Sequence, residues 1–385
     1  MLLPLAGPMP RTSSRVRALT AAAAAALLAL PLTGCADFSD QDRSRQAGPF
    51  SSVPERGGPG QDQPPPPDTE ETDPPKGPCV DPNPAVIATC LGTTGGVRPA
   101  DPAGKTTYVA ERRTGKIIIS KRYGPQREVA AVPVDGGGDG GLIDFELSPT
   151  YLQDQMIYAL ITTGEDNRIV RIAPGNSVKP ILTGIPKGAT GNMGSISFVS
   201  PSELRVATGN AGNPGAANDP SSLAGKIFSI DPDAPAPRPT MIAAGFGSNV
   251  ALCPDPLSGT LFVADSGPAG DRLQQVEAGG LRLLWSWADR PGVTGCAVTE
   301  GVISVSIASK FRIDSLTAPT NANPTVSEPQ ASDVKEQFGA VGRMSTFGAA
   351  AQIATINKSV PGAPPTTTND RVAIFAGSAS AEDRT

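Results

Sequence analysis

The sequence has 385 residues, which is enough for one large domain or two ordinary ones. Its 43 Gly and 41 Pro together exceed a fifth of the chain, aromatic residues are only 4%, and histidine is absent. Abundant turn formers with few long helical runs favour a β-rich fold of many short strands. The formal net charge is −5 and no cluster of Lys and Arg occurs, which argues against nucleic-acid binding because phosphate contacts need clustered cations.

The amino-terminal segment predicts export and lipid anchoring. Three arginines precede an apolar run at 18–32, which is too short for an ordinary membrane span and typical of a signal peptide. The run ends in "LTGC", which resembles the lipobox of bacterial lipoproteins, where the signal is removed before a cysteine that then carries lipid. We expect a signal peptide at 1–34, lipidation (palmitate) at Cys35, and a location on the outer face of the cytoplasmic membrane. An ordinary cleaved signal with a chance cysteine is the alternative.

Residues 35–78 are predicted to form a disordered tether. They contain "GGPGQDQPPPPDTEETDPPKGP", which is rich in Pro and acidic residues and nearly free of large apolar ones. Such a segment buries too little surface to offset its ordering entropy. Its expected role is to hold the following domain away from the membrane.

From 79 to 377 short β-type runs alternate with turn clusters, and 378–385 is expected to be a disordered tail. The runs recur about every 45–50 residues, as an inner strand, a second apolar strand and a third strand with charged residues near its start. Repeated antiparallel strands at this spacing indicate an all-β fold, a six-bladed β-propeller. A β-sandwich or two small β domains are the alternatives. The repeating segments lie at 106–120, 144–173, 195–231, 249–278, 295–316 and 344–376.

Four cysteines follow Cys35, and an exported chain meets an oxidising compartment. The even count suggests two disulfides, for which three pairings exist. We favour Cys79–Cys90, which is local, and Cys253–Cys296, which would join two neighbouring repeats. A metal site is the rival interpretation, and it lacks both CxxC spacing and histidine.

Three motifs resemble the glucose/sorbosone dehydrogenase family. They are "GDGGLIDFELSPTYLQDQMIY" from Gly138, "GNPGAANDPSSLAGKI" from Gly212, and "GFGSNVALCPDPLSGTLFVADSGP" from Gly245. The resemblance covers about 300 residues and implies a six-bladed propeller. It also implies pyrroloquinoline quinone (PQQ) and Ca²⁺ over the central channel, with oxidation of sugar hydroxyls. The whole chain, from lipobox to "DRVAIF", also resembles a mycobacterial envelope lipoprotein, which suggests an actinobacterial source and a cell-wall setting.

The sequence departs from the family where the chemistry requires a base. Sugar oxidation needs a group that takes the hydroxyl proton while hydride leaves, and the family uses a histidine at the head of an inner strand. The matching stretch is "GNMGSISF", which places Gly191 at the base position. Glycine cannot accept a proton, and the chain has no other histidine. We therefore predict no catalytic residue here.

The cofactor-binding positions also differ. The three carboxylates of PQQ favour arginine partners. A family Arg-Asn pair matches Gly247 and Ser248, and of two arginines near the carboxyl end only Arg343 is retained. Asp139 or Gly140 matches a polar position where an acid would repel the quinone. PQQ is therefore not expected. The residues proposed for a residual pocket are Asp139, Asn192, Asn249, Lys310 and Arg343.

The sequence allows two interpretations of the loop around Gly267, a Ca²⁺ site and a plain turn. The carbonyls of Gly267 and Pro268, with Asp265 and Asp271 nearby, match the family's Ca²⁺ loop in part. A plain turn closing a blade is the alternative.

The long loop that begins at Gly212 is also open to two interpretations. As scaffold, its Asn213, Asn218 and Asp219 cap backbone groups while Gly225 allows close approach at the blade edge. As a ligand-binding loop, it would lie on the channel face.

These observations favour a non-catalytic, lipid-anchored binding or scaffold module. Its partner would be a cell-wall glycan, a small ligand in the channel mouth, or another envelope protein. The first rival is a PQQ- and Ca²⁺-dependent sugar dehydrogenase with a rearranged site, in which Arg343, Lys310 and Arg290 hold the cofactor and Asp139 is the base. The second is a Ca²⁺-dependent hydrolytic propeller of the lactonase kind.

Overall fold

The computed structural model describes residues 76–363, 366 and 368–377. The predicted signal peptide, the lipid-bearing Cys35, nearly all of the tether and the tail lie outside these residues. In the described part, no helix is long and apolar enough to cross a membrane.

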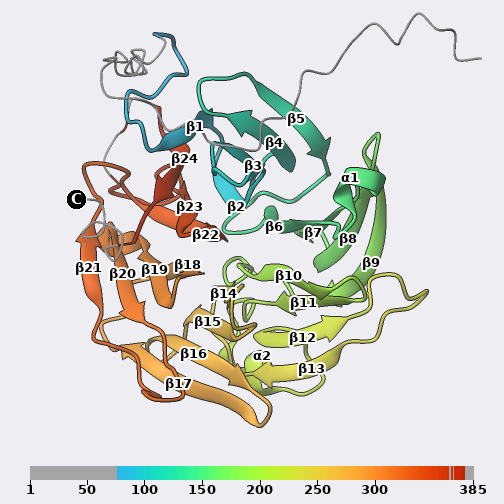
Figure 1. Cartoon of the computed structure of the whole chain (residues 1–385). Helices are drawn as coiled ribbons and strands as arrows, with labels where there is room; N and C mark the ends of the chain where they lie inside the picture. The colour runs from blue at the N-terminus through green and yellow to red at the C-terminus, as the bar shows by residue number, and fades with distance from the viewer. Residues whose placement is uncertain (1–75, 364–365, 367, 378–385) are drawn as a thin grey trace, which may run out of the picture. The chain divides into compact units, whose positions relative to one another are not determined.

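The strands of the described residues form six four-stranded antiparallel sheets arranged in a ring around a central axis (Figure 1). We number these sheets as blades I to VI in chain order. Blade I holds β2 (Thr94–Pro99), β3 (Thr106–Glu111), β4 (Lys116–Lys121) and β5 (Gln126–Ala131); blade II holds β6 (Leu142–Leu147), β7 (Ile157–Thr162), β8 (Asn167–Ala173) and β9 (Ser177–Ile185); blade III holds β10 (Ser195–Ser200), β11 (Glu203–Ala207), β12 (Lys226–Ile230) and β13 (Thr240–Ala244). Blade IV holds β14 (Val250–Pro254), β15 (Leu261–Ser266), β16 (Asp271–Glu277) and β17 (Gly280–Trp287); blade V holds β18 (Val293–Thr299), β19 (Val302–Ile307), β20 (Arg312–Thr317) and β21 (Gln330–Asp333); blade VI holds β22 (Val341–Phe347), β23 (Ala350–Thr355), β24 (Asp370–Phe375) and β1 (Val86–Leu91). The helices of the described residues are the short α1 (Tyr151–Asp154), α2 (Pro214–Asn218) and a 3-10 turn at Ala308–Lys310.

The first strand of each blade is the innermost one, except that β22 takes this place in blade VI. Glycines on these strands let neighbouring blades approach closely. A Cβ on Gly95 would lie 2.6 Å from the carbonyl oxygen of Leu142, and one on Gly295 would lie 2.4 Å from that of Gly342. The hydrophobic core therefore consists of clusters between adjacent blades, because each sheet buries its faces only against its neighbours.

The ring is closed by the amino-terminal strand. β1 pairs antiparallel with β24, with Val86 opposite Ala373, so blade VI combines both ends of the propeller. A buried ion pair supports the closure, since Arg371 Nη1 lies 2.8 Å from Asp81 Oδ2. Because β1 precedes blade I in the sequence and β24 follows blade V, this pairing holds the two ends of the propeller together.

The prediction of an all-β six-bladed propeller is confirmed. Both expected disulfides are present, and Cys253–Cys296 joins β14 to β18 of neighbouring blades. The prediction of three strands per repeat missed the fourth, outermost strand. Some of those strands, such as β5 and β21, are largely exposed and polar, so they lack the apolar pattern of the inner ones. The outermost strand of blade VI, β1, is instead mostly buried.

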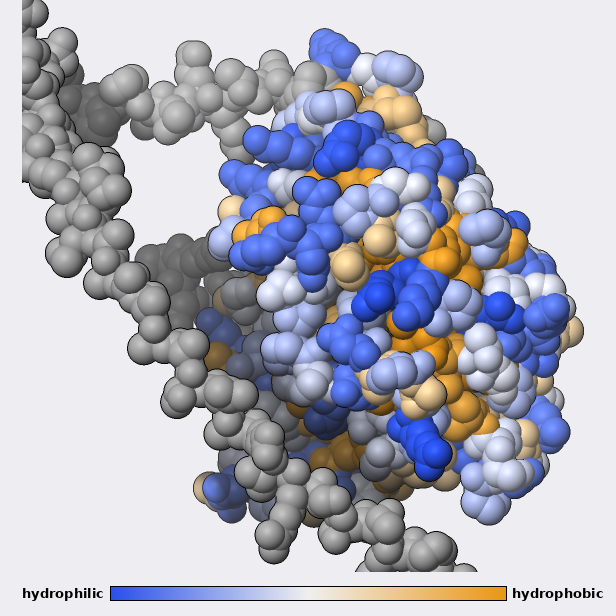
Figure 2. All heavy atoms as spheres, turned by 90° about the vertical axis from the view of Figure 1, so that its right-hand side faces the viewer, coloured by the Kyte–Doolittle hydropathy of each residue, from blue (hydrophilic) through white to orange (hydrophobic). Residues whose placement is uncertain are grey.

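The outer surface is mostly hydrophilic with local apolar regions. On the side of blades II and III, hydrophobic atoms form a band between hydrophilic ones (Figure 2). The exposed large hydrophobic residues of the described chain are Tyr123, Leu152, Val199, Met241, Leu257 and Leu283.

Candidate functional site at the two channel mouths

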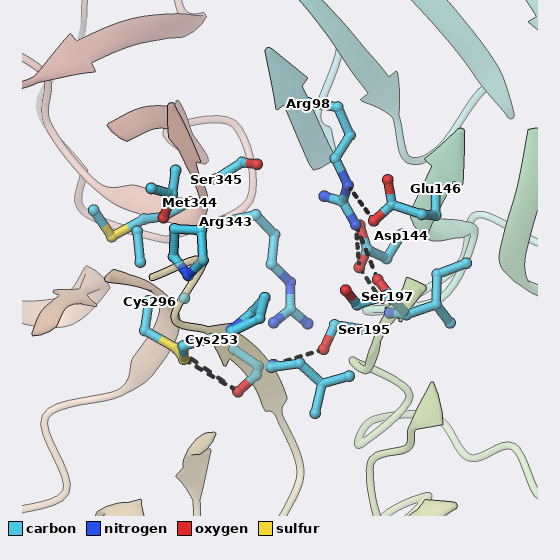
Figure 3. A pocket seen from close by; sticks show the side chains of 18 of the residues that line it. Arg98, Asp144, Glu146, Ser195, Ser197, Cys253, Cys296, Arg343, Met344 and Ser345 are labelled. Carbon is cyan, nitrogen blue, oxygen red and sulfur yellow. Dashed lines mark hydrogen bonds and ion pairs between the residues drawn. A yellow bond between two sulfur atoms is a disulfide. The ribbon is translucent and has the colours of Figure 1, made fainter. Parts of the chain in front are cut away.

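Two cavities lie along the inner strands, one nearer to the starts of the strands and one nearer to their ends. Residues at or just before the strand starts line a cavity of about 370 Å³, which we call the first mouth. Residues toward the strand ends line a cavity of about 320 Å³, which we call the second mouth (Figure 3). Arg343 is common to both linings, so its side chain lies between them. The first mouth is lined by Thr94, Arg112, Asp139, Met193, Asn249 and Thr294 among others, and the second by Arg98, Glu146, Ser197, Pro254, Ala297 and Phe347 among others.

Gly191, the residue at the family's base position, is enclosed at the edge of the first mouth. Its φ is +80°, in the left-handed region that favours glycine. A Cβ here would lie 2.4 Å from the nitrogen of Gly212 and 2.7 Å from Asn210 Oδ1. The carbonyl of Gly191 also accepts a 2.8 Å hydrogen bond from the amide of Ala211. A side chain at this position therefore requires the loop at 210–212 to move.

Asp139 holds this turn in place. Its carboxylate accepts hydrogen bonds from the amide of Gly191 at 2.7 Å and from Nδ2 of Asn192 at 2.6 Å, with a longer one from the Asn192 amide. Asn192 is itself buried and donates to the carbonyl of Gly188. Asp139 thus lines the mouth while its oxygens fix the backbone, which leaves it poorly suited to take a proton from a substrate.

The two arginines of the first mouth are already engaged by the protein. Arg343 donates to the carbonyls of Val250 at 3.1 Å and Gly194 at 2.7 Å and to Oδ1 of Asn249 at 3.0 Å. Burial lowers the pKa of Arg343 to about 10, and the nearby charge of Arg98 acts in the same direction.

The guanidinium of Arg112 is engaged in the same way. It donates to the carbonyls of Gly138 and Gly140 and to Oγ of Ser359. Burial lowers the pKa of Arg112 as well.

Lys310 lies outside this mouth, contrary to the expectation that it belongs to the pocket. Ala308 and Ser309 of its 3-10 turn line the cavity, whereas the Lys310 ammonium lies 3.9 Å from Asp289 and is about half exposed. Arg290 is also exposed. The structure therefore brings together Asp139, Asn249 and Arg343, with Asn192 behind Asp139.

These residues do not fit PQQ. A quinone with three carboxylates needs free cations, and the two arginines among the described lining residues both serve backbone carbonyls. A Cβ on Gly247, the position that the resemblance matches to a family arginine, would lie 1.6 Å from the carbonyl oxygen of Ser266. An arginine at 247 would thus overlap the backbone. The acid Asp139 adds repulsion.

The carboxylates of the proposed Ca²⁺ loop also have partners within the protein. Asp265 is fully buried and accepts from Arg272 at 2.6 and 3.0 Å and from the amide of Gly247 at 3.0 Å. Asp271 accepts from the amides of Gly292 and Val293. Burial raises the pKa of both carboxyls.

The glycine and proline of that loop offer only backbone. Gly267 packs against the Arg272 side chain, with a Cβ position 2.9 Å from its Nε, and Pro268 is exposed. Within residues 76–363, 366 and 368–377, no three His, Cys, Asp or Glu side chains are grouped to hold a metal. The carboxylate of Asp265 thus holds groups within blade IV, and that of Asp271 links blade IV to the start of blade V.

The long loop after β11 is held together by the chain itself. Asn213 caps α2 by accepting from the amides of Gly215 and Ala216, and Asp219 accepts from the amide and hydroxyl of Ser221. Lys226 was not predicted to take part. Its buried ammonium donates to the carbonyls of Ala216 at 2.9 Å, Ala217 at 2.8 Å and Ala224 at 3.0 Å. These contacts favour the scaffold interpretation of the loop.

The charged cluster of the second mouth was not predicted either. Arg98 Nε lies 3.0 Å from Glu146 Oε2, and its Nη2 lies 3.2 Å from Asp144 and donates to the carbonyl of Ile196 (Figure 3). The amide of Ile196 in turn donates to Asp144 Oδ2 at 3.0 Å. Burial raises the pKa of Glu146, and burial opposes the charge on Arg98, whose pKa nevertheless rises because of Asp144 and Glu146. Asp144 and Glu146 are two residues apart on β6, so the strand period was the available signal.

Known proteins support the resemblance. Residues 100–281 match the family model "Glucose / Sorbosone dehydrogenase". The PQQ-bound aldose sugar dehydrogenase of Streptomyces coelicolor is 26% identical, with a TM-score of 0.65 over 75% of this chain and 95% of that one. A glucose dehydrogenase-type oxidoreductase of Thermus thermophilus is 23% identical, with a TM-score of 0.64 over 75% and 98%.

The fold is shared more widely than the sequence. The soluble aldose sugar dehydrogenase of Escherichia coli, solved in its apo form, is 14% identical, with a TM-score of 0.60 over 76% of this chain and 99% of that one. A search of curated proteins found no match. The chain is therefore glucose/sorbosone dehydrogenase-like, by sequence over residues 100–281 and by fold over the propeller.

Proposed function

We propose that this chain is a lipid-anchored envelope protein whose propeller binds a ligand without oxidising it. The observation that carries the proposal is steric. The positions that match the family's base and one cofactor arginine are Gly191 and Gly247, and the backbone is packed against both. The surrounding loops therefore leave no room for a histidine at position 191 or an arginine at position 247.

Quinone-dependent sugar oxidation requires a base within hydrogen-bond reach of the sugar hydroxyl and cations for the cofactor. Asp139 is the acid nearest the base position, and three donors from Gly191 and Asn192 already occupy it. The guanidinium groups of Arg112 and Arg343 are bound to carbonyl oxygens. The chain retains the scaffold of a dehydrogenase while its polar groups stabilise that scaffold.

The proposed setting is the cell envelope, with a cell-wall glycan or another envelope protein as partner. The lipobox at Cys35, the preceding apolar run and the resemblance to a mycobacterial lipoprotein support anchoring. Two disulfides in the propeller fit an oxidising compartment. Cys35→Ala should abolish acylation and leave the signal peptide attached, which gives a precursor of higher mass. Mass spectrometry of the wild-type amino terminus should show acyl chains, and an unmodified Cys35 would contradict the anchor.

The rival proposal is a PQQ- and Ca²⁺-dependent sugar dehydrogenase with a rearranged site. It is favoured by the family match and by the PQQ-bound relative. The two proposals separate in one experiment, in which the full chain in detergent is mixed with PQQ, Ca²⁺ and a panel of aldoses, and dye reduction is followed. We expect no reduction above the rate without protein. Turnover that depends on both PQQ and sugar would establish the rival.

A further inference from the structure

The second mouth is a separate cavity from the one that matches the family's site. Gly191, Gly247 and Asp139 all belong to the first mouth or its rim, at the starts of the inner strands. The second mouth is lined by the later residues of the same strands, such as Arg98 of β2 and Phe347 of β22. Since Arg343 lies between the two cavities, a ligand in one does not need access to the other.

The walls of the second mouth combine apolar surfaces with free hydroxyl groups. Pro254, Met344 and Phe347 supply apolar surface, and Ser197 and Ser345 line the same space from β10 and β22 (Figure 3). Neither hydroxyl makes a hydrogen bond to any described residue. A wall that contains both apolar side chains and hydroxyl groups suits a ligand that has both apolar CH faces and hydroxyl groups.

The charges of the second mouth are balanced and held in place. Arg98 is paired with Glu146 and Asp144, and the buried Arg343 adds one cation. An anionic ligand would face two carboxylates, and a cationic ligand would face two guanidinium groups. A neutral ligand meets neither penalty, and it finds both strong donors and strong acceptors.

Two buried polar atoms at this mouth lack hydrogen-bond partners. Asp144 is 2% exposed and its Oδ1 accepts no hydrogen bond in the described chain, although Arg98 Nη2 lies 3.2 Å away. Nε of Arg343 is also without a partner there. Both atoms have almost no exposed surface, and Asp144 Oδ1 lies against Gly96, where an added Cβ would be 2.0 Å away. They therefore belong to the wall of the cavity, and the groups that a ligand can reach are the carboxylate of Glu146 and the serine hydroxyls.

We propose that the second mouth binds a neutral, polyhydroxylated ligand, one or two sugar rings of a glycan, with Glu146, Ser197 and Ser345 contacting its hydroxyls. The cavity of about 320 Å³ lies at the small end of the range for ligand sites, which suits a ligand of this size. This inference rests on the proposed binding function and assigns it a mouth and a ligand class.

The test is a binding assay of the full chain in detergent against methyl glycosides and short neutral oligosaccharides. Saturation-transfer NMR identifies the binders, and calorimetry gives their Kd. Ser345→Trp fills the second mouth. Ser248→Trp is the matched control, because Ser248 is a half-buried serine without a side-chain hydrogen bond that lines the first mouth. Glu146→Gln removes the charge without changing the size of the side chain.

We expect at least one neutral saccharide to bind. Ser345→Trp should weaken the binding of that saccharide by about tenfold or more because the indole occupies the cavity, and Glu146→Gln should do so because a charge-assisted hydrogen bond is lost. Ser248→Trp should leave the Kd within about twofold of the wild-type value. Thermal melts verify folding, and Ser197→Trp repeats the block from β10 if Ser345→Trp unfolds. Loss of binding in Ser248→Trp alone would move the site to the first mouth, and absence of binding across the panel would overturn the proposal. Neither result would restore quinone-dependent oxidation, which the dye assay tests separately.

Discussion

The amide of Gly191 donates a 2.7 Å hydrogen bond to the carboxylate of Asp139. The first residue stands where the related dehydrogenases are expected to have their base, and the second is the acid that sequence reasoning offered as a replacement. Instead of acting on a substrate, the acid binds the backbone of the glycine. This contact makes Asp139 a structural group beside the position where the resemblance places a base.

Gly191→Ala should be strongly destabilising. Its φ of +80° costs alanine about 1–2 kcal/mol, and the Cβ would overlap Gly212, so a total loss of about 3 kcal/mol or more is expected in urea unfolding. Gly184→Ala is the matched control, because Gly184 has φ +79° and open space around its Cβ position. It should lose only about 1–2 kcal/mol. Equal losses would show that the loop does not enclose position 191.

Lys226→Met should weaken the loop between β11 and β12. The change leaves three buried carbonyls without their ammonium donor, and we expect a loss of about 3 kcal/mol or more in the free energy of unfolding. Hydrogen exchange should rise first at residues 212–225. Lys179→Met, at an exposed position of β9, is the control and should stay within about 0.5 kcal/mol of the wild type. A stable Lys226→Met variant with an unchanged exchange pattern would remove the lysine from this role.

The closing blade should carry a pH dependence at Asp370. Burial raises the pKa of this carboxyl from 3.8 to about 6. Between these values the folded chain keeps a proton that the unfolded chain has released, so the free energy of unfolding falls as pH rises from about 4 to about 6, by at most about 3 kcal/mol. Above that range this group adds no further slope.

Asp370→Asn should remove that contribution. Urea unfolding at several pH values between 4 and 7 should show the stability of the variant increasing relative to wild type as pH rises. The exposed Asp289→Asn serves as the control for charge alone. Parallel curves for Asp370→Asn and wild type would contradict the effect of burial.

The two disulfides should differ in their contributions. Cys253–Cys296 closes 43 residues and joins two blades, whereas Cys79–Cys90 closes 11. The loop-entropy relation gives about 4 and about 3 kcal/mol. Replacing Cys253 and Cys296 by alanine also opens space in the core between β14 and β18, so its loss should be clearly the larger in thermal unfolding. A larger loss for the Cys79 and Cys90 pair would show that closing the ring limits stability.

The fold was predictable because its signals are local and repeated. The inner and second strands alternate apolar and polar residues, the turns are marked by Gly and Pro, and the cysteine count fits two bridges. Outermost strands such as β5 and β21 were not predicted, because their side chains are largely exposed and carry no such pattern.

The site was predictable only where a motif matched position by position. That match found Gly191, Gly247 and Arg343, and it brought Asp139 and Asn249 to one mouth. It failed for Lys310, because one turn of 3-10 helix directs Ala308 and Ser309 inward and the lysine toward Asp289. It also missed the pairing of Arg98 with Asp144 and Glu146, because the strand period places the two acids on one face of β6 but does not identify their partner on the neighbouring blade.

The most direct test of the central claim is an equilibrium titration of the full chain with PQQ in the presence of Ca²⁺, followed by thermal unfolding. A ligand that binds the native state raises the melting temperature by mass action. The aldose sugar dehydrogenase of Streptomyces coelicolor, whose structure is PQQ-bound, is the positive control. We predict a shift for the control and none for this chain, because Gly191 and Gly247 are packed and Arg112 and Arg343 are engaged. A comparable, saturable rise in the melting temperature of this chain would contradict the account and show that the chain binds PQQ.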